Sequence, residues 1–465
     1  MDNREDFKKT AKILADKFKE LDKGVIRIIS NLDTDGITAA AILVSALKRE
    51  GIKFSLSFVK QLSKGFLQSM KKEPYKTIIF ADLGSSVISN IKKYLADKNI
   101  FILDHHIAEY DDKKIYHLNQ HLFGLEEYNE ISAAGVCYFF AKALDEKNMD
   151  LAHIAFIGAV GDVQEYKGVH GLNKEILEDA INNGKIDVKT GLRIFGYQTR
   201  AIHKVLEYCV DPYIPGVSGS ESGAVAFLSE CGIEAKTDAD WRRIIDLNDD
   251  EMKKLITGII LRRIGREENP GDVLGPIYTL RNEEEGSVIK DIKEFATLLN
   301  ACARLGKPSL AMAVLFDETT KGKAVVLLEE YKSMIMRALQ WFYENRKTEN
   351  IFEGNGFTII NAGDNIKDTI IGVMAGIISR AGIYPDGTII ISIANNMEGD
   401  LKSSIRVAGL KVNENLNVKD ILTDIVKGLD AEVGGHKLAA GSLVNINKQE
   451  DFIKNIKTIL SNRKV

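Results

Sequence analysis

The chain has 465 residues, 45% of them hydrophobic, and a formal net charge of −4 at pH 7. This length predicts two or three hydrophobic cores, because a single core stops growing at roughly 250–300 residues. The balanced charge excludes a globally basic protein, so a nucleic-acid partner would need a local patch or bound metal to hold it. The four cysteines are scattered and form no CxxC pair, which argues against a zinc ribbon and a disulfide framework. We expect a cytoplasmic protein with no membrane partner, since no apolar run approaches the ~20 residues that span a bilayer.

Strands and helices alternate in the first part of the chain, after an N-terminal segment (1–23) with the period of an amphipathic helix. Four apolar runs have the length and composition of buried strands: 25–30, 54–59, 76–82 and 99–104. Three segments have helical length and periodicity: 37–51, 132–145 and 151–162. Such alternation predicts a doubly wound parallel sheet of the α/β class.

The middle of the chain is dominated by charged stretches with helical period, and the Gly-, Pro- and Ser-rich segment 211–223 has the composition of a loop or junction. Strand-like runs return at 357–363, 387–396 and 403–409. We therefore expect three domains, namely a doubly wound domain (1–195), an inserted, mostly helical or mixed module (196–345) and a smaller α/β domain (346–465).

Acids and histidines gather near the ends of the predicted elements in the first domain. Four short stretches contain them: NLDTDG with Asp33 and Asp35, FADLGSS with Asp82, LDHHIAE with Asp104, His105 and His106, and GAVGDVQE with Asp162. Each stretch by itself is more often a helix cap or a solvated turn. The carboxyl ends of parallel strands meet at one edge of a sheet, however, so we expect these side chains to converge.

Converging carboxylates repel, by about 4 kcal/mol for each pair at ~4 Å and an effective dielectric constant of ~20. None of the four stretches contains a lysine or arginine that would neutralise them. Protonation would relieve the repulsion, but divalent cations relieve it better and also account for the histidines. Carboxylate and imidazole without thiolate suit Mn²⁺, with Mg²⁺ as the alternative. Two ions with a spare imidazole would suit metal-assisted phosphoryl hydrolysis.

Two basic segments have two interpretations each. Residues 193–204 interleave basic and aromatic residues, a pattern that can stack on single-stranded bases but is more often an ordinary surface. Residues 261–267 form a basic cluster in a helix of mixed charge, where a solvated face is more frequent than a binding patch.

The order of DTDG, ADLGSS, LDHH and GAVGD resembles the four motifs of the DHH phosphoesterase superfamily. The stretch GGHKLAAG (434–441) is similar to the Gly-Gly-His signature of the DHH-associated C-terminal domain of that superfamily. The length and the long middle segment resemble RecJ-like single-strand exonucleases of archaeal type, which include GINS-associated nucleases. The resemblance implies a DHH catalytic domain, an inserted module and a substrate-binding C-terminal domain.

The resemblance also implies a role for each acid. Asp33 would bind one metal ion and Asp35 the other, and Asp82 would bridge the two. His105 and Asp162 would complete the shell of the second ion.

Further roles follow from the same resemblance. His106 would contact the scissile phosphate, and Asp104 would support the histidines. The residues implied in phosphate binding in the C-terminal domain are Arg406, Gly434, Gly435 and His436. Many relatives have His or Asp shortly before the first acid, whereas this chain has Asn31, so the first ion would lack a protein ligand there or use the Asn31 amide oxygen.

The leading functional hypothesis is a Mn²⁺-dependent single-strand exonuclease that acts 5′→3′ on DNA or also on RNA, in replication or repair. One alternative is a phosphodiesterase for oligonucleotides or cyclic dinucleotides. Another is a replisome scaffold that binds GINS or other components of the replicative helicase. The intact second to fourth motifs favour catalysis over a purely structural role.

Overall fold

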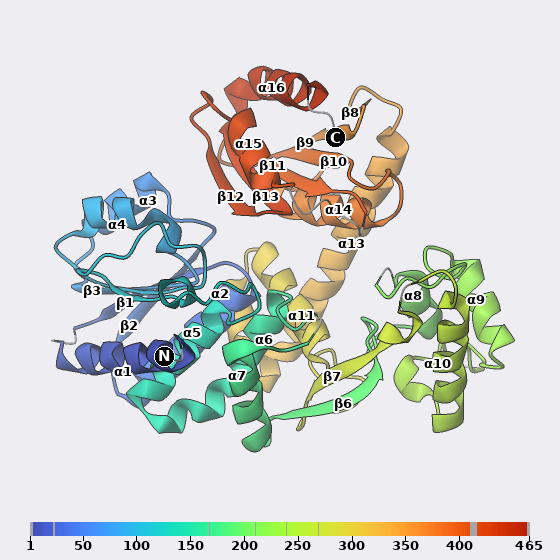
Figure 1. The fold of residues 1–465 in the computed structure, drawn as a ribbon, viewed down its shortest axis with the longest axis horizontal. Coiled ribbons are helices and arrows are strands. Elements are labelled where there is room, and N and C mark those ends of the chain that lie inside the picture. The colour runs from blue at the N-terminus through green and yellow to red at the C-terminus, as the bar shows by residue number, and fades with distance from the viewer. Residues whose placement is uncertain are drawn as a thin grey trace. The chain divides into compact units, whose positions relative to one another are not determined.

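The structure is a computed structural model that describes residues 3–21, 24–166, 168–209, 211–238, 240–267, 269–409 and 416–462. The chain forms two compact units, Met1–Leu327 and Leu328–Val465. The second unit is coloured orange to red in Figure 1. No helix in the described ranges is long and apolar enough to cross a membrane.

The first unit is built on a five-stranded parallel sheet with the strand order β2-β1-β3-β4-β5. Its strands are β1 (Ile26–Asn31), β2 (Phe54–Val59), β3 (Thr77–Ala81), β4 (Asn99–Leu103) and β5 (Tyr116–Leu118). β1, β3 and β4 are almost entirely buried, because parallel strands are covered by helices on both faces. The predicted doubly wound sheet is confirmed.

Helices cover both faces of this sheet (Figure 1). One face packs against α3 (Lys64–Met70) and α4 (Ile88–Leu95), where Leu67 and Ile91 join a core with Phe80. The helices of the other side are α1 (Asn3–Glu20), α2 (Thr34–Arg49), α5 (Ala133–Leu144), α6 (Ala152–Gly161) and α7 (Gly171–Asn182). On that face the ring of Phe18 meets Phe101 edge to face, with centroids 5.4 Å apart.

An insertion with a core of its own follows α7. It is carried by a two-stranded antiparallel ribbon of β6 (Ile186–Leu192) and β7 (Leu274–Leu280). Its helices are α8 (Ile202–Glu207), α9 (Glu221–Glu230) and α10 (Asp249–Arg263). The mixed, mostly helical character of this module is as predicted, whereas no ribbon was predicted from the sequence. The predicted boundaries at 195 and 345 stay a prediction.

Several cations of the two basic segments are paired with acids of the same module, among them Arg262 with Glu230 and Arg263 with Asp272 in the second segment. Lys204 Nζ lies 2.9 Å from carboxylate oxygens of both Glu207 and Glu221. Arg193 pairs with Asp211 at 3.1 Å. These pairs favour an ordinary, internally neutralised surface over a strand-binding patch.

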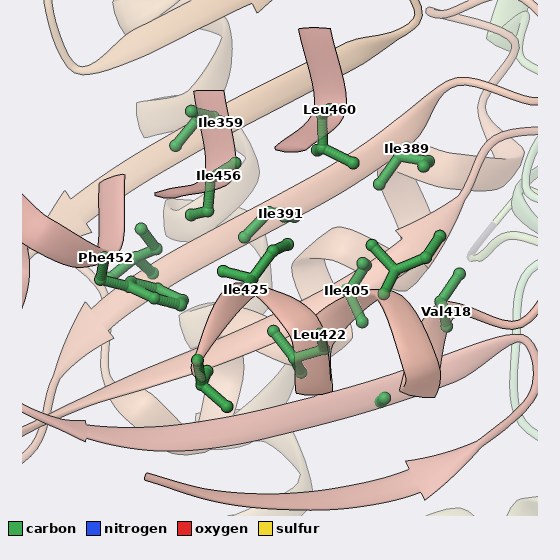
Figure 2. Packing of buried hydrophobic residues seen from close by; sticks show 14 of the residues in the cluster. Ile359, Ile389, Ile391, Ile405, Val418, Leu422, Ile425, Phe452, Ile456 and Leu460 are labelled. Carbon is green, nitrogen blue, oxygen red and sulfur yellow. The ribbon is translucent and has the colours of Figure 1, made fainter. Parts of the chain in front are cut away.

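Three helices follow the ribbon: α11 (Ile292–Arg304), α12 (Pro308–Val314) and α13 (Lys321–Asn345). The second unit contains a six-stranded mixed sheet with the order β12-β13-β11-β10-β9-β8. Its strands are β8 (Ile351–Gly354), β9 (Phe357–Gly363), β10 (Ile389–Asn395), β11 (Asp400–Val407), β12 (Glu432–His436) and β13 (Ala439–Asn445). The sheet packs against α14 (Asp368–Arg380), α15 (Val418–Ile425) and α16 (Gln449–Ser461). Figure 2 shows Ile391 and Ile405 of the sheet packed with Leu422 and Ile425 of α15 and with Ile456 of α16.

Close helix packing beneath the first sheet depends on Gly158 in α6. A Cβ atom at this position would lie 2.5 Å from the Cβ of Ala134 in α5 and 2.5 Å from Thr38 Oγ1 in α2. Neither neighbour is the far end of a flexible side chain, so the three helices would have to separate to accept it.

We therefore expect Gly158→Ala to lower the free energy of unfolding. Overpacking costs about 1–3 kcal/mol, which outweighs the gain of up to ~1 kcal/mol in helix propensity. The matched control is Gly322→Ala in the first turn of α13, where an added Cβ meets nothing within 4 Å and stability should be unchanged or higher. Thermal unfolding compares the two, and equal effects would contradict the packing argument.

Candidate metal centre

The predicted acids of the first domain lie at the carboxyl edge of the parallel sheet. Asp82 follows β3 directly, Asp104 follows β4, and Asp162 follows the last residue of α6. Asp35 is in the first turn of α2, because this helix begins at Thr34 and not at residue 37 as its periodicity suggested. The earlier start results from Asp33, whose Oδ1 accepts the Gly36 N–H at 2.9 Å and caps the helix.

Three of these carboxylates converge on His105. Its Nε2 atom is 3.3 Å from Asp162 Oδ2 and 3.6 Å from Asp82 Oδ1. The same atom is 3.9 Å from Asp35 Oδ2. His106 Nδ1 lies 3.7 Å from Asp82 Oδ1. Two groups therefore have potential ligand atoms within 4.8 Å of one another, the first made of Asp82, His105 and His106 and the second of Asp35, His105 and Asp162.

Asp82 is the most constrained member of the centre. Its backbone has a φ of 57°, an unusual value for a residue other than glycine, and its side chain is buried. Within the described structure, its Oδ1 atom has no hydrogen-bond partner. Burial raises the pKa of this carboxyl well above its usual range, and the charges of Asp33 and Asp35 raise it further. A buried acid oxygen without a donor fits a divalent cation, because both the charge and the lone pairs need a partner.

Asp35 is held by the start of another helix. Its two carboxylate oxygens accept the backbone N–H groups of Ala133 at 2.7 Å and Ala134 at 2.9 Å, at the N-terminus of α5. Burial raises the pKa of Asp35 to about 7, although these N–H groups act in the opposite direction. The carboxylate is thereby fixed with one oxygen toward His105, as a ligand of a cation would need to be.

Asp104 anchors the histidine pair instead of joining the open cluster. Its Oδ1 accepts hydrogen bonds from His106 Nδ1 and from the His105 backbone N–H, both at 2.8 Å. Its Oδ2 accepts the Ser85 N–H at 2.9 Å. Burial alone would lower the pKa of His106, but the Asp104 carboxylate raises it to about 9. His106 is therefore cationic at neutral pH in the metal-free protein, and a third of its side chain is exposed to solvent.

Asp33 and Asn31 lie at the margin of the centre. Asp33 belongs to neither of the two groups found in the described residues, although its charge raises the pKa of Asp82. Asn31 Oδ1 accepts the Leu32 N–H at 2.7 Å, and its Nδ2 donates to Asp33 Oδ2 at 3.4 Å. The assignment of Asp33 to a first metal ion stays a prediction.

Several residues that support the centre were missed in the sequence. Asn119 Nδ2 donates to the His106 carbonyl at 2.7 Å and to Ser85 Oγ at 2.8 Å. Gln164 Nε2 lies 3.3 Å from His105 Nδ1. Gln164 stands two residues after Asp162, which was a usable signal, whereas nothing in the sequence around Asn119 indicates this role.

The predicted phosphate-binding residues lie together in the sheet of the second unit. Arg406 in β11 pairs in register with Ala439 in β13, which pairs in turn with His436 in β12. Gly435 has a φ of 122°, and a Cβ there would lie 2.5 Å from the Ala439 carbonyl oxygen, so glycine is required. Gly434 precedes Gly435 in β12. The side chain of His436 lies outside the described part of the structure.

Three regions of the chain match known domains. Residues 25–159 match the DHH family, N-terminal domain, residues 194–273 match the DHH-CID domain, and residues 355–462 match the DHHA1 domain. The chain therefore contains an N-terminal domain of the DHH family, a DHH-CID domain and a DHHA1 domain. These matches confirm the resemblance seen in the motifs.

Similar proteins extend the likeness over almost the whole chain. An uncharacterized protein of Methanocaldococcus jannaschii is 29% identical over 469 residues, covering 96% of this chain and 99% of the relative. CDC45 from Entamoeba histolytica has a TM-score of 0.69 at 12% identity, covering 99% of both chains. RecJ from Thermus thermophilus, solved with Mn²⁺, has a TM-score of 0.59 at 15% identity. That match covers 98% of this chain but 55% of the RecJ chain. The fold of this DHH protein is RecJ-like.

Replacing Asp104 by Asn should lower the pKa of His106 from about 9, because the imidazolium loses its hydrogen-bonded carboxylate while burial, which lowers the pKa, remains; the charges of Asp162 and Asp33 still act to raise it. In the wild type, the stabilising effect of charged His106 is present below pH 6.5 and is lost as the pH rises through about 9. An NMR titration of the imidazole signals in chelator-treated protein measures the shift. Asp112→Asn, which removes a partner of Lys92 instead, is the control, and an unchanged His106 pKa in Asp104→Asn would contradict the pairing.

Asp82→Asn should stabilise the metal-free protein. Because the pKa of Asp82 is raised on folding, its contribution to stability falls as the pH rises above its unfolded value of 3.8. Asparagine has the same shape, carries no charge and tolerates the positive φ. We expect the melting temperature at pH 7 with chelator to rise by on the order of a few degrees, measured by calorimetry. A lower melting temperature would mean that the buried repulsion is absent.

Proposed function

We propose that this DHH-family protein is a divalent-metal-dependent exonuclease that hydrolyses phosphodiesters in single-stranded nucleic acid. We propose Mn²⁺ as the preferred ion, DNA as the main substrate, a 5′→3′ direction and a role in replication or repair. The single observation that carries the proposal is the buried Asp82 oxygen without a hydrogen-bond donor in the described structure, faced by two histidines and surrounded by other acids. The RecJ structures with Mn²⁺ and with Mg²⁺ support a divalent cation, without distinguishing the two ions.

In this proposal, Asp35, Asp82, His105 and Asp162 would hold one cation, and Asp33 would help to hold a second. Divalent cations at such a site act as Lewis acids and lower the pKa of water to near neutrality. The residues of the chain supply the rest of the chemistry. The α5 N-terminus fixes the Asp35 carboxylate, and burial keeps bulk water from competing for it.

His106 has the properties of a group that meets the substrate. It is cationic near neutral pH, partly exposed, and held by Asp104 through Nδ1, so the proton on Nε2 is the one that it can offer to a ligand. A fixed positive charge there stabilises negative charge that develops on a phosphoryl oxygen, and the same proton can pass to the leaving oxygen. Arg406 and the backbone of Gly434, Gly435 and His436 are proposed to hold a further phosphate of the strand.

The likeness to CDC45 supports a second candidate, a replisome component that binds GINS or helicase subunits. The two roles predict different consequences of changing Asp82, because a scaffold does not use the cation.

An assay with Mn²⁺ tests the proposal directly. Long single strands labelled at either end, duplexes, and linear and cyclic dinucleotides are the substrates. We expect degradation of the long single strands from the 5′ end, and a loss of at least about 10³-fold in Asp82→Ala, with an unchanged circular dichroism spectrum. Asp187→Ala in β6, an acid paired with Arg281 outside the centre, should retain full activity.

Each other outcome supports a different function. Hydrolysis of dinucleotides alone would favour a small-substrate phosphodiesterase. Binding of replisome proteins without any hydrolysis would favour the scaffold. Full activity in Asp82→Ala would overturn the proposed centre.

A further inference from the structure

Helix α11 lies outside all three matched domain regions but packs against the centre. The matches end at residue 273 and resume at 355, whereas α11 spans Ile292–Arg304. It follows the ribbon strand β7 and belongs to the same compact unit as the parallel sheet. No motif in the sequence marked this helix.

Helix α11 contacts the segment from Asp33 to Asp35 through Thr34, the residue between these two acids. The backbone N–H of Thr34 donates to Asn300 Oδ1 at 3.1 Å, and its Oγ1 donates to the Ala296 carbonyl at 2.8 Å. Thr34 is 1% exposed, so these are the partners that replace water. As the first residue of α2, Thr34 has an N–H group that the helix itself cannot satisfy.

The opposite side of this loop is closed by α6. A Cβ at Gly161 would lie 2.6 Å from Thr34 Cβ, and a Cβ at Gly158 would lie 2.6 Å from Asp35 Oδ1. The loop can therefore not move toward α6. Asn300 on one side and Gly158 and Gly161 on the other therefore restrict the movement of the segment from Asp33 to Asp35.

Two other side chains of α11 reach neighbouring parts of the unit. Lys293 Nζ lies 3.0 Å from Glu165 Oε1, three residues after Asp162. Glu294 Oε1 accepts the Gln198 N–H at 2.8 Å, at the base of the inserted module. One helix thus fixes both acid-bearing loops and joins them to the insertion.

We propose that Asn300 is a positioning residue of the metal centre, which acts through the Thr34 N–H to hold Asp33 and Asp35 in place to bind a cation. This inference rests on the proposed metal site. Replacing Asn300 with a side chain of similar size that cannot accept a hydrogen bond leaves the buried Thr34 N–H without a partner. The loop then shifts toward water, and both acids move with it.

Isothermal titration of chelator-treated protein with Mn²⁺ alone, without any nucleic acid, tests this role. We expect Asn300→Leu to bind Mn²⁺ at least about 10-fold more weakly than the wild type, as is usual when a group that orients a ligand is removed. Asn300→Asp keeps the acceptor and should bind as well as the wild type or better. Thr297→Ala is the control on the same helix, because the Thr297 Oγ1 hydroxyl donates to the Lys293 carbonyl within α11 and not to the acid-bearing segment.

The set of variants separates this inference from the proposed function. Wild-type affinity in Asn300→Leu would overturn the positioning role while leaving the metal site standing. A loss in Asn300→Asp equal to that in Asn300→Leu would also overturn it, because packing and not the acceptor would then matter. No Mn²⁺ binding by the wild type would overturn the metal site and this inference together. Circular dichroism shows whether each variant is folded. If Asn300→Leu is not folded, Asn300→Ser replaces it, because the shorter serine side chain cannot reach Thr34.

Discussion

The Oδ1 atom of Asp82 is buried beside other carboxylates and has no hydrogen-bond donor in the described part of the chain. The charges of Asp33, Asp35 and Asp162 all raise its pKa. Two like charges at ~4 Å repel by about 4 kcal/mol at an effective dielectric constant of ~20, which is a large part of the net stability of about 5–15 kcal/mol of a typical domain. A buried carboxylate among other carboxylates needs a positive charge to compensate it. The two neighbouring histidines indicate that this charge is a bound cation.

Much of the first unit can be understood as support for this cluster. The N-terminus of α5 holds Asp35, Asp104 fixes the histidines, and α11 fixes the loop through Thr34. Each support comes from a different element, so a change in any one of them alters the geometry of the same few oxygen atoms.

The sequence was sufficient for the parts of the site that depend on chain order. Asp82 and Asp104 follow buried strands, and parallel pairing brings strand ends together whatever the details of packing. The contact between Asn300 and Thr34 joins residues 266 positions apart, and no local pattern encodes it. The ribbon was missed for a different reason, because only the two end residues of β6 are buried and β7 contains Gly275 and Pro276, so neither has the alternation of a half-buried strand.

The fold by itself does not decide between a nuclease and a structural protein. RecJ and CDC45 structures both superimpose on almost the whole chain, at 15% and 12% identity. Likeness at this level establishes architecture, whereas function depends on the site. The grouping of Asp35, Asp82 and Asp162 around His105 is therefore the feature that favours catalysis.

The most direct test of the metal centre is X-ray diffraction from a crystal soaked in Mn²⁺, recorded at a wavelength where manganese scatters anomalously. We expect an anomalous peak in contact with Asp82 Oδ1 and His105 Nε2, at the carboxyl edge of the parallel sheet. An empty site there at saturating Mn²⁺, with Asp82 Oδ1 hydrogen-bonded to a protein donor instead, would contradict it.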